Sequence, residues 1–263
     1  MSGPGNGAGL GLLLLLVRSR FGWAGVIVVL LGYFLLTNFG GGSRVADVDG
    51  QHTVTSPDDE AAAFVGFVLD DVQDTWAARS PLHGQPYRRA KLVLFTGATR
   101  TACGLGESAT GPFYCPGDDS VYIDLGFNQV LRERLGAGGD FAQAYVIAHE
   151  IGHHVQHILG ATAAGHREGP SGASVRLELQ ADCYAGVWAH ASHRRELLEQ
   201  GDLEEALGAA AAIGDDTLQR RAGGRVRPES FSHGTSAQRV RWFQRGYESG
   251  DPDRCDTFGA ASL

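Results

Sequence analysis

Residues 148–156 read AHEIGHHVQ, a stretch that combines metal-binding side chains with helical spacing. It contains His-Glu-x-x-His, in which His149 and His153 are four residues apart. Residues at positions i and i+4 lie on the same face of a helix, so both imidazoles can bind one zinc ion. Glu150 then lies beside that ion, where it can accept a proton from an activated water molecule. The stretch predicts a buried helix that carries one catalytic zinc ion per chain.

A catalytic zinc ion needs a third protein ligand, and Glu178 is the best candidate. The extended metzincin motif, in which a third histidine binds the zinc, would require Gly and His where Gln156 and Leu159 stand. The sequence therefore excludes the metzincin class. Asp182 follows Glu178 by one helical turn and can accept the outer ring N–H of a zinc-binding histidine. A surface carboxylate pair, and a helix with histidines on its polar face, are the alternatives.

Composition limits the classes of protein to consider. The chain has 263 residues, 43% of them hydrophobic, enough for one sizeable core. Its net charge is −8, and nucleic-acid binding needs clustered Arg and Lys. We therefore expect no nucleic-acid partner.

Residues 21–39 contain no charged side chain and predict a transmembrane helix. Nineteen helical residues rise about 28 Å, close to the thickness of the bilayer hydrocarbon. Arg18 and Arg20 precede this segment, so the positive-inside rule places 1–20 in the cytoplasm and exports the rest. Residues 40–57 form a flexible tether, and 58–263 form the exported domain of a single-pass protein of the cell membrane. A cleaved signal peptide, cut near Val45 and Ala46, is the alternative.

All four cysteines lie beyond the predicted span. An even number of cysteines in an exported domain predicts two disulfide bonds. Cys103 and Cys115 flank a glycine-rich loop and pair most naturally with each other, which leaves Cys183 to pair with Cys255. Four reduced, buried thiols in a cytoplasmic domain are the alternative.

The remaining pattern predicts an α+β, mainly helical domain. Strands are expected at 91–95 and 120–125, and the second is expected to be the sheet edge beside the zinc helix. Tyr122 and Asp124 are then candidate substrate-binding residues, with ordinary strand side chains as the alternative. Helices are expected from 58 to about 78, from 202 to about 221, and from a cap at Thr235 or Ser236 through Tyr247.

Several separate motifs in the chain resemble those of one family. The Glu-x-x-x-Asp pair is similar to that of the gluzincin class of metallopeptidases. HEIGHHVQ, ELQADCYAGVWA, ATGPFYCP, VYIDL and FSHGTSAQRVRWFQRGYESGDPDRCDTF together resemble the bacterial putative neutral zinc metallopeptidase family, from about residue 58 to 257. The resemblance implies a zincin-like fold and one N-terminal membrane span. By analogy with gluzincins, His233 is expected to face the zinc and stabilise an oxyanion. A histidine that satisfies loop hydrogen bonds is the alternative, and Arg239 could orient a carboxylate or ligand.

Together these features predict a membrane-anchored zinc peptidase that hydrolyses a peptide or protein substrate. Zinc would activate the water, and Glu150 would be the general base. One alternative is a non-catalytic zinc-containing scaffold or regulator at the cell envelope. A zinc-storage module is another, although it should contain more Cys and His ligands.

Overall fold

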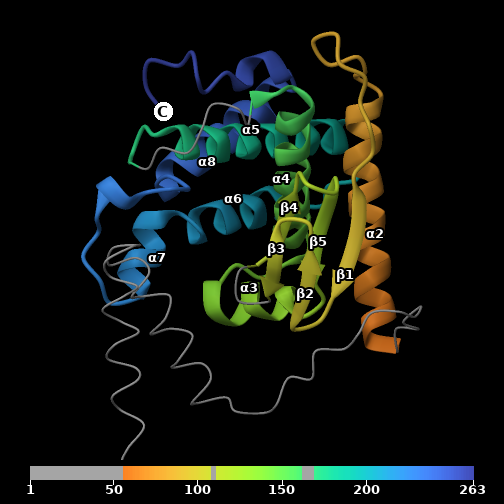
Figure 1. The fold of residues 1–263 in the computed structure, drawn as a ribbon, viewed down its shortest axis with the longest axis horizontal. Helices are drawn as coiled ribbons and strands as arrows, with labels where there is room; N and C mark the ends of the chain where they lie inside the picture. The colour runs from red at the N-terminus through yellow and green to blue at the C-terminus, as the bar shows by residue number, and fades with distance from the viewer. Residues whose placement is uncertain (1–55, 108–110, 162–168) are drawn as a thin grey trace, which may run out of the picture. The chain divides into compact units, whose positions relative to one another are not determined.

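Figure 1 shows the computed structural model, which describes residues 56–107, 111–161 and 169–263. The expected cytoplasmic segment, the membrane span at 21–39 and the tether up to residue 55 lie outside the described residues. Within the described ranges, no helix is both long and apolar enough to cross a membrane. The first described helix begins at Ser56, so the last two residues assigned to the tether are helical.

The described chain is mainly helical, with two small sheets, and this confirms the predicted α+β class. The helices are α2 (Ser56–Ala77), α3 (Phe127–Leu135), α4 (Asp140–Ile158), α5 (Ala173–Arg194), α6 (Asp202–Ala212), α7 (Asp215–Arg221) and α8 (Ser236–Ser249), with short 3-10 turns η3 (Pro228–Ser230) and η4 (Pro252–Cys255). The strands are β1 (Lys91–Phe95), β2 (Ala98–Thr101), β3 (Gly104–Glu107), β4 (Phe113–Cys115) and β5 (Ser120–Asp124).

Helix α4 lies at the centre of the fold and packs against α2, α5 and α6 (Figure 1). Its side chains are buried on nearly every face, as the apolar run before the histidines predicts. At Gly152, an added Cβ would lie 3.0 Å from the Cα of Ala181 on α5. This glycine therefore lets α4 and α5 approach closely, which brings the histidines of one helix to the carboxylates of the other.

The larger sheet has the strand order β1-β5-β4, so β5 is its central strand. β1 runs parallel to β5, from Lys91 opposite Ser120 to Phe95 opposite Asp124, whereas β4 runs antiparallel to β5. The prediction that 120–125 forms the sheet edge was therefore wrong. Every residue of β5 is buried, as suits a strand with neighbours on both sides. The edge beside α4 is β4, whose three residues are too few for a recognisable strand pattern.

Two disulfide bonds connect elements that are separate in sequence. Cys103 pairs with Cys115 and ties the tip of the β2–β3 hairpin to the end of β4. Cys183 pairs with Cys255 and ties α5 to the turn η4. These are the two pairs that the spacing predicts.

The C-terminal helices depart from prediction at one point and agree with it at another. The helix expected from 202 to about 221 is interrupted, because Gly214 is extended and Asp215 begins a new helix. The last helix, α8, is capped by Thr235, whose side chain accepts the N–H of Gln238 in a capping box. Helices α5 and α8 pack closely side by side.

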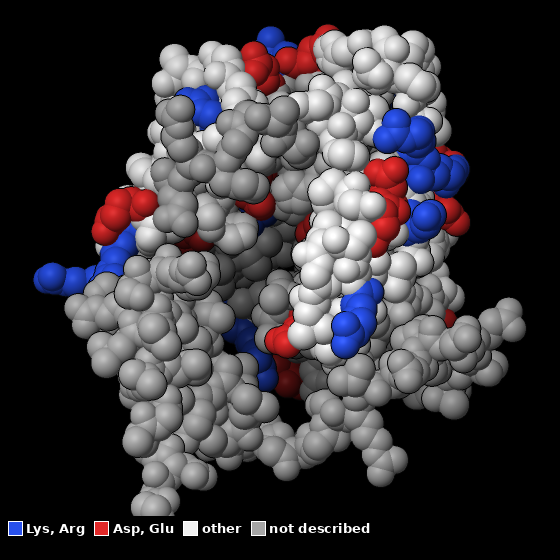
Figure 2. Space-filling model, in the orientation of Figure 1, with Lys and Arg blue, Asp and Glu red and all other residues white. Residues whose placement is uncertain are grey.

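The described surface carries charges of both signs. Basic and acidic groups lie next to each other on the right of Figure 2, the side on which α2 and β1 lie in Figure 1. Among such neighbours, Arg89 forms ion pairs with Asp70 and Asp74 of α2. Such exposed pairs contribute little to stability, so the fold depends on its apolar core and on the buried network described below.

Candidate metal centre

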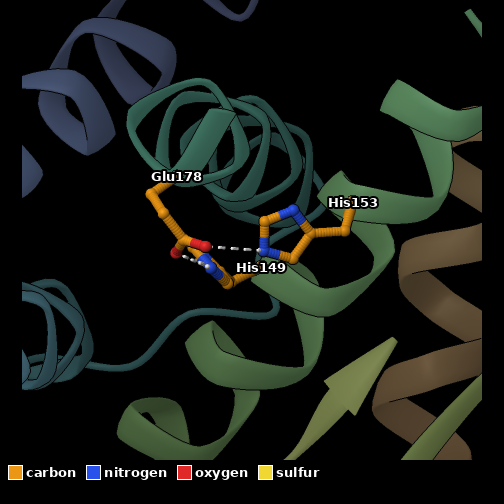
Figure 3. A group of neighbouring side chains, drawn as sticks. All are labelled: His149, His153 and Glu178. Carbon is orange, nitrogen blue, oxygen red and sulfur yellow. Dashed lines mark hydrogen bonds and ion pairs between the residues drawn. The ribbon is translucent and has the colours of Figure 1, made fainter. Parts of the chain in front are cut away.

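His149, His153 and Glu178 point toward one another across the contact between α4 and α5 (Figure 3). Each offers one donor atom, and these atoms all lie within 4.8 Å of one another. Oε2 of Glu178 lies 3.2 Å from Nε2 of His149, and Oε1 lies 3.5 Å from Nε2 of His153. The structure thus gathers the three residues that the sequence nominates as ligands.

The outer nitrogen of each histidine ring has its own acceptor, which fixes the ring orientation. Nδ1 of His149 donates to Oδ1 of Asp182 at 2.8 Å. Nδ1 of His153 lies 2.9 Å from Oε1 of Gln156, whose Nε2 donates to the carbonyl of Leu177. Because the NH2 group of Gln156 donates to Leu177, the amide oxygen is the atom that accepts the Nδ1–H of His153. With Nδ1 of each ring bound on its outer side, Nε2 of each ring faces Glu178.

Asp182 is fully buried, and its carboxylate is surrounded by donors. Besides His149, the hydroxyl of Tyr145 donates to Oδ1 at 2.5 Å. Arg239 of α8, only 2% exposed, donates from Nε to Oδ2 and from Nη2 to Oδ1, both at 2.8 Å. A buried carboxylate with this many donors keeps its charge and can hold His149 in one orientation.

The buried carboxylates create a negative field around the histidine nitrogens. Burial opposes the charge of Asp182, yet Arg239 and His149 outweigh it and lower the pKa of Asp182 to about 2. Burial likewise opposes ionisation of Glu178, but His153 and His149 hold its pKa well below the usual range. Burial lowers the pKa of His149, whereas Asp182 and Glu178 raise it to about 9. A divalent cation is stabilised by the same field.

These donors suit zinc. Two imidazole nitrogens and one carboxylate oxygen form the ligand set of many catalytic zinc sites, and they leave a fourth position for water or substrate. The acceptors behind both imidazoles complete the arrangement that zinc-binding histidines usually have.

Glu150 lies between the two histidines in sequence and is 7% exposed. Burial raises the pKa of its carboxyl, against the influence of His153 and His149. Its Oε2 accepts the backbone N–H of Tyr114 on β4 at 2.8 Å. A hydrogen bond from the edge strand thus holds Glu150 in place. Glu150 is not one of the three grouped metal-binding residues. A carboxylate with a raised pKa beside a metal ion is suited to accept and return a proton.

His233 lies in the loop before α8 and is bound to Asp215 at the start of α7. Nδ1 of His233 is 3.1 Å from Oδ1 of Asp215, while Oδ2 accepts three backbone N–H groups, those of Ser232, His233 and Gly234. The hydrogen bond to Asp215 raises the pKa of His233, and the charge of Glu178 adds to the effect. The imidazole is thus positioned by one ring nitrogen and interacts electrostatically with the proposed metal ligand.

Comparison with known proteins assigns the chain to a family. A family model described as "putative neutral zinc metallopeptidase" matches residues 1–258. The chain belongs to this family. It is 48% identical to the uncharacterized protein YpfJ of Escherichia coli K12 over 98% of this chain and 91% of that protein. It is 45% identical to the uncharacterized protein Rv2575 of Mycobacterium tuberculosis H37Rv over 74% of this chain and 69% of that protein. No solved structure matches the chain significantly.

Two residues expected to bind substrate in this zinc metallopeptidase family member are buried and hydrogen-bonded within the sheet and its turns. Tyr122 is 5% exposed, stacks on Phe113 and donates its hydroxyl to Asp118. Asp124 is 4% exposed and accepts the backbone N–H groups of Gly97 and Gly126. Both belong to the central strand β5, so their side chains stabilise the sheet and its turns. Their role in substrate binding stays a prediction.

Sequence reasoning missed several residues that support the site. Gln156 stands three residues after His153 on the same helix, a spacing that could have indicated its contact. Tyr145 stands four residues before His149 and could have been found in the same way. Asp215 and Tyr114 reach His233 and Glu150 from other elements. Nothing in the local sequence signals these two contacts.

Proposed function

We propose that this protein is a zinc-dependent peptidase in which Glu150 is the general base. The proposal depends on one observation: His149 and His153, each held by a hydrogen bond at Nδ1, converge on Glu178. The buried carboxylate of Glu150, whose pKa is raised, lies next to His149 in the chain. Membership of the zinc metallopeptidase family supports the same conclusion. The substrate class is a peptide or protein.

The reaction follows from the arrangement of the donors. A zinc ion held by His149, His153 and Glu178 would polarise the scissile carbonyl and lower the pKa of a water molecule. Glu150 accepts the proton of that water and passes it to the leaving amine. Its raised pKa brings the carboxyl closer to neutral pH, which favours both the uptake and the return of the proton.

His233 is proposed to stabilise the negative charge that develops on the carbonyl oxygen. Asp215 binds its Nδ1, so Nε2 is the nitrogen that remains for a substrate. The raised pKa favours the charged imidazole, which is the stronger donor to an oxyanion. The imidazole is about half exposed, as a group that meets an incoming substrate must be.

The alternative of a non-catalytic zinc scaffold is less well supported. A purely structural zinc site is closed by four protein ligands, whereas three residues are grouped here among those that the structure describes. A scaffold also needs no buried carboxylate beside the metal. The side chain of Glu150 therefore favours catalysis.

Matched variants of Glu150 and Glu178 separate the two functions. Glu150→Gln keeps the size of the side chain but removes proton transfer, so it should bind about one zinc ion and lose hydrolysis by several orders of magnitude. Glu178→Ala should lose zinc. Metal analysis after gel filtration and cleavage of a proteome-derived peptide library would measure both. A wild-type protein that binds zinc but cleaves nothing would favour the scaffold, and full zinc occupancy in Glu178→Ala would remove Glu178 from the ligand set.

We further propose that residues 21–39 anchor the protein in the cell membrane, with the catalytic domain on the extracytoplasmic side. The uncharged segment and the preceding Arg18 and Arg20 support this topology. The two disulfide bonds are consistent with an oxidising compartment. Protease added to intact spheroplasts should digest the domain. Full protection until lysis would contradict the orientation.

A further inference from the structure

We propose that Tyr114 is a positioning residue that fixes Glu150 by attaching strand β4 to helix α4 at two points. The inference deepens the proposed function, because it rests on Glu150 acting as the base. In the described part of the chain Tyr114 forms no hydrogen bond with the three grouped ligands, so its effect on the reaction would be transmitted through Glu150.

The first point of attachment is the backbone. Tyr114 is the middle residue of the edge strand β4, between Phe113 and Cys115 that pair with β5. Alternate residues of an edge strand direct their N–H away from the sheet. The N–H of Tyr114 meets Oε2 of Glu150 at 2.8 Å. One carboxylate oxygen is thereby fixed to the sheet, and the other remains for proton transfer.

The second point of attachment is the phenol. Its oxygen lies 2.8 Å from Oδ1 of Asp119 and 3.0 Å from Nδ1 of His154. His154 is fully buried, and its Nε2 donates to the carbonyl of Arg88 at 2.6 Å. The Tyr114 ring also packs against the His154 ring, with centroids 5.1 Å apart. The hydroxyl has one proton, which it donates to Asp119 or to Nδ1 of His154, and the ring contact adds to its attachment to His154, which the loop before β1 holds in place.

Glu150 and His154 are one turn apart on α4, so Tyr114 contacts the same helix face with its backbone and its side chain. Two contacts prevent β4 from sliding along the helix, whereas one would act as a pivot. Cys115 follows directly and adds the disulfide to the β2–β3 hairpin. A shift of the base by about 1 Å can cost on the order of a hundredfold in rate, so this attachment matters for catalysis.

Tyr114→Phe removes the hydroxyl and keeps the backbone N–H, the ring and the zinc ligands. We expect kcat to fall roughly tenfold with little change in KM, since the residue acts through the base and not through substrate binding. Zinc content should stay at the wild-type level. Tyr247→Phe, which removes an exposed hydroxyl bound to His193 at the C-terminal end of α5, is the matched control and should keep the wild-type kcat. A wild-type kcat in Tyr114→Phe would overturn the proposal.

Amide hydrogen exchange tests the attachment without relying on activity. In the ¹⁵N-labelled full-length protein, the amide of residue 114 should exchange slowly in the wild type and in Glu150→Gln, whose side-chain oxygen still accepts. It should exchange at least about tenfold faster in Glu150→Ala and in Tyr114→Phe. Equal rates in the wild type and Glu150→Ala would overturn the proposal. Should Tyr114→Phe not fold, Asp119→Ala removes one anchor of the phenol, and an unchanged rate there would count equally against it.

The kinetic and hydrogen-exchange experiments together distinguish a failure of this inference from a failure of the proposed function. A wild-type protein that cleaves no peptide, together with the expected exchange rates, would reject the peptidase function and retain the attachment of Glu150 to β4. Normal cleavage with a wild-type kcat and unaltered exchange in Tyr114→Phe would retain the peptidase function and reject the role of Tyr114.

Discussion

Arg239 and Asp182 form a buried, two-pronged ion pair, with both N–O distances at 2.8 Å, although the residues are 57 positions apart in the chain. The same carboxylate accepts Nδ1 of His149. One charged group therefore connects α8, α5 and the histidine helix. Removing its partner would leave an uncompensated buried charge directly behind a proposed metal ligand.

Arg239→Met tests the ion pair. We expect the free energy of unfolding to fall by about 3–5 kcal/mol, because Asp182 loses its main counter-charge in a buried place. Zinc affinity should fall by roughly ten- to a hundredfold, as for other losses behind a ligand. Urea denaturation and competition with a zinc chelator would measure the two effects. Arg220→Met, which breaks the exposed pair with Asp216, is the control and should cost about 1 kcal/mol or less.

The stability of the His233–Asp215 contact should depend on pH. Asp215 raises the pKa of His233 above its ordinary 6.5. The charged imidazole then contributes stability that is complete below about pH 6.5 and is lost as the pH rises through the folded-state pKa. His233→Ala should therefore destabilise the protein more at about pH 6 than at about pH 9. The difference should stay below about 1 kcal/mol, since the side chain is half exposed. Urea denaturation at both pH values would measure it, and a larger loss at the higher pH would contradict the prediction.

The crossing of α5 and α8 requires glycine at position 246. An added Cβ there would lie 1.9 Å from the carbonyl oxygen of Cys183, which forbids any side chain without a shift of the helices. Gly246→Ala should cost about 3 kcal/mol or more and lower zinc affinity, because Arg239 moves with α8. Gly208→Ala is the matched control. Its added Cβ meets nothing within 4 Å in the interior of α6, so it should stabilise by about 0.5–1 kcal/mol. Thermal denaturation would measure the stability of both variants, and a Gly246→Ala protein as stable as the wild type would contradict the prediction.

Removal of the disulfide bonds should reflect the lengths of the loops that they close. Replacing Cys183 and Cys255 by Ser opens a separation of 72 residues and should cost about 4 kcal/mol. The same change at Cys103 and Cys115 opens 12 residues and should cost about 3 kcal/mol. Equilibrium unfolding would measure both, and non-reducing peptide mapping should recover the two pairs from the wild type. Four free thiols in membrane-fraction protein would refute the assignment.

The sequence predicts those parts of the fold and site that depend on local spacing. His149 and His153 face the same way because one helical turn separates them, and this needs no knowledge of the tertiary structure. The bounds of β1 and the start of β5 could be read from apolar and β-branched runs, and the predicted second strand ran one residue past Asp124. Glu178 could be nominated because a helix with a second carboxylate one turn later follows the histidines.

Features that depend on how distant elements meet were beyond the sequence. Strand β4 has three residues and the β2–β3 hairpin has glycines in its second strand, so neither has a strand pattern of its own. Because β4 could not be recognised, the edge of the sheet was assigned to β5, whose side-chain pattern alternates but which is the central strand. The contact between Tyr114 and Glu150 spans 36 residues and uses a backbone N–H, which carries no sequence signal at all.

The place of α8 in the chain has a consequence for biosynthesis. A polypeptide growing from its N-terminus contains all three proposed metal ligands before Arg239 is made. Until then Asp182 lacks its guanidinium partner, and Cys183 lacks the thiol of Cys255. The support behind His149 is therefore completed only after α8 and Cys255 have been synthesised. A chain that has not yet reached α8 carries the ligands without that support, so a fully formed metal centre has to await this helix.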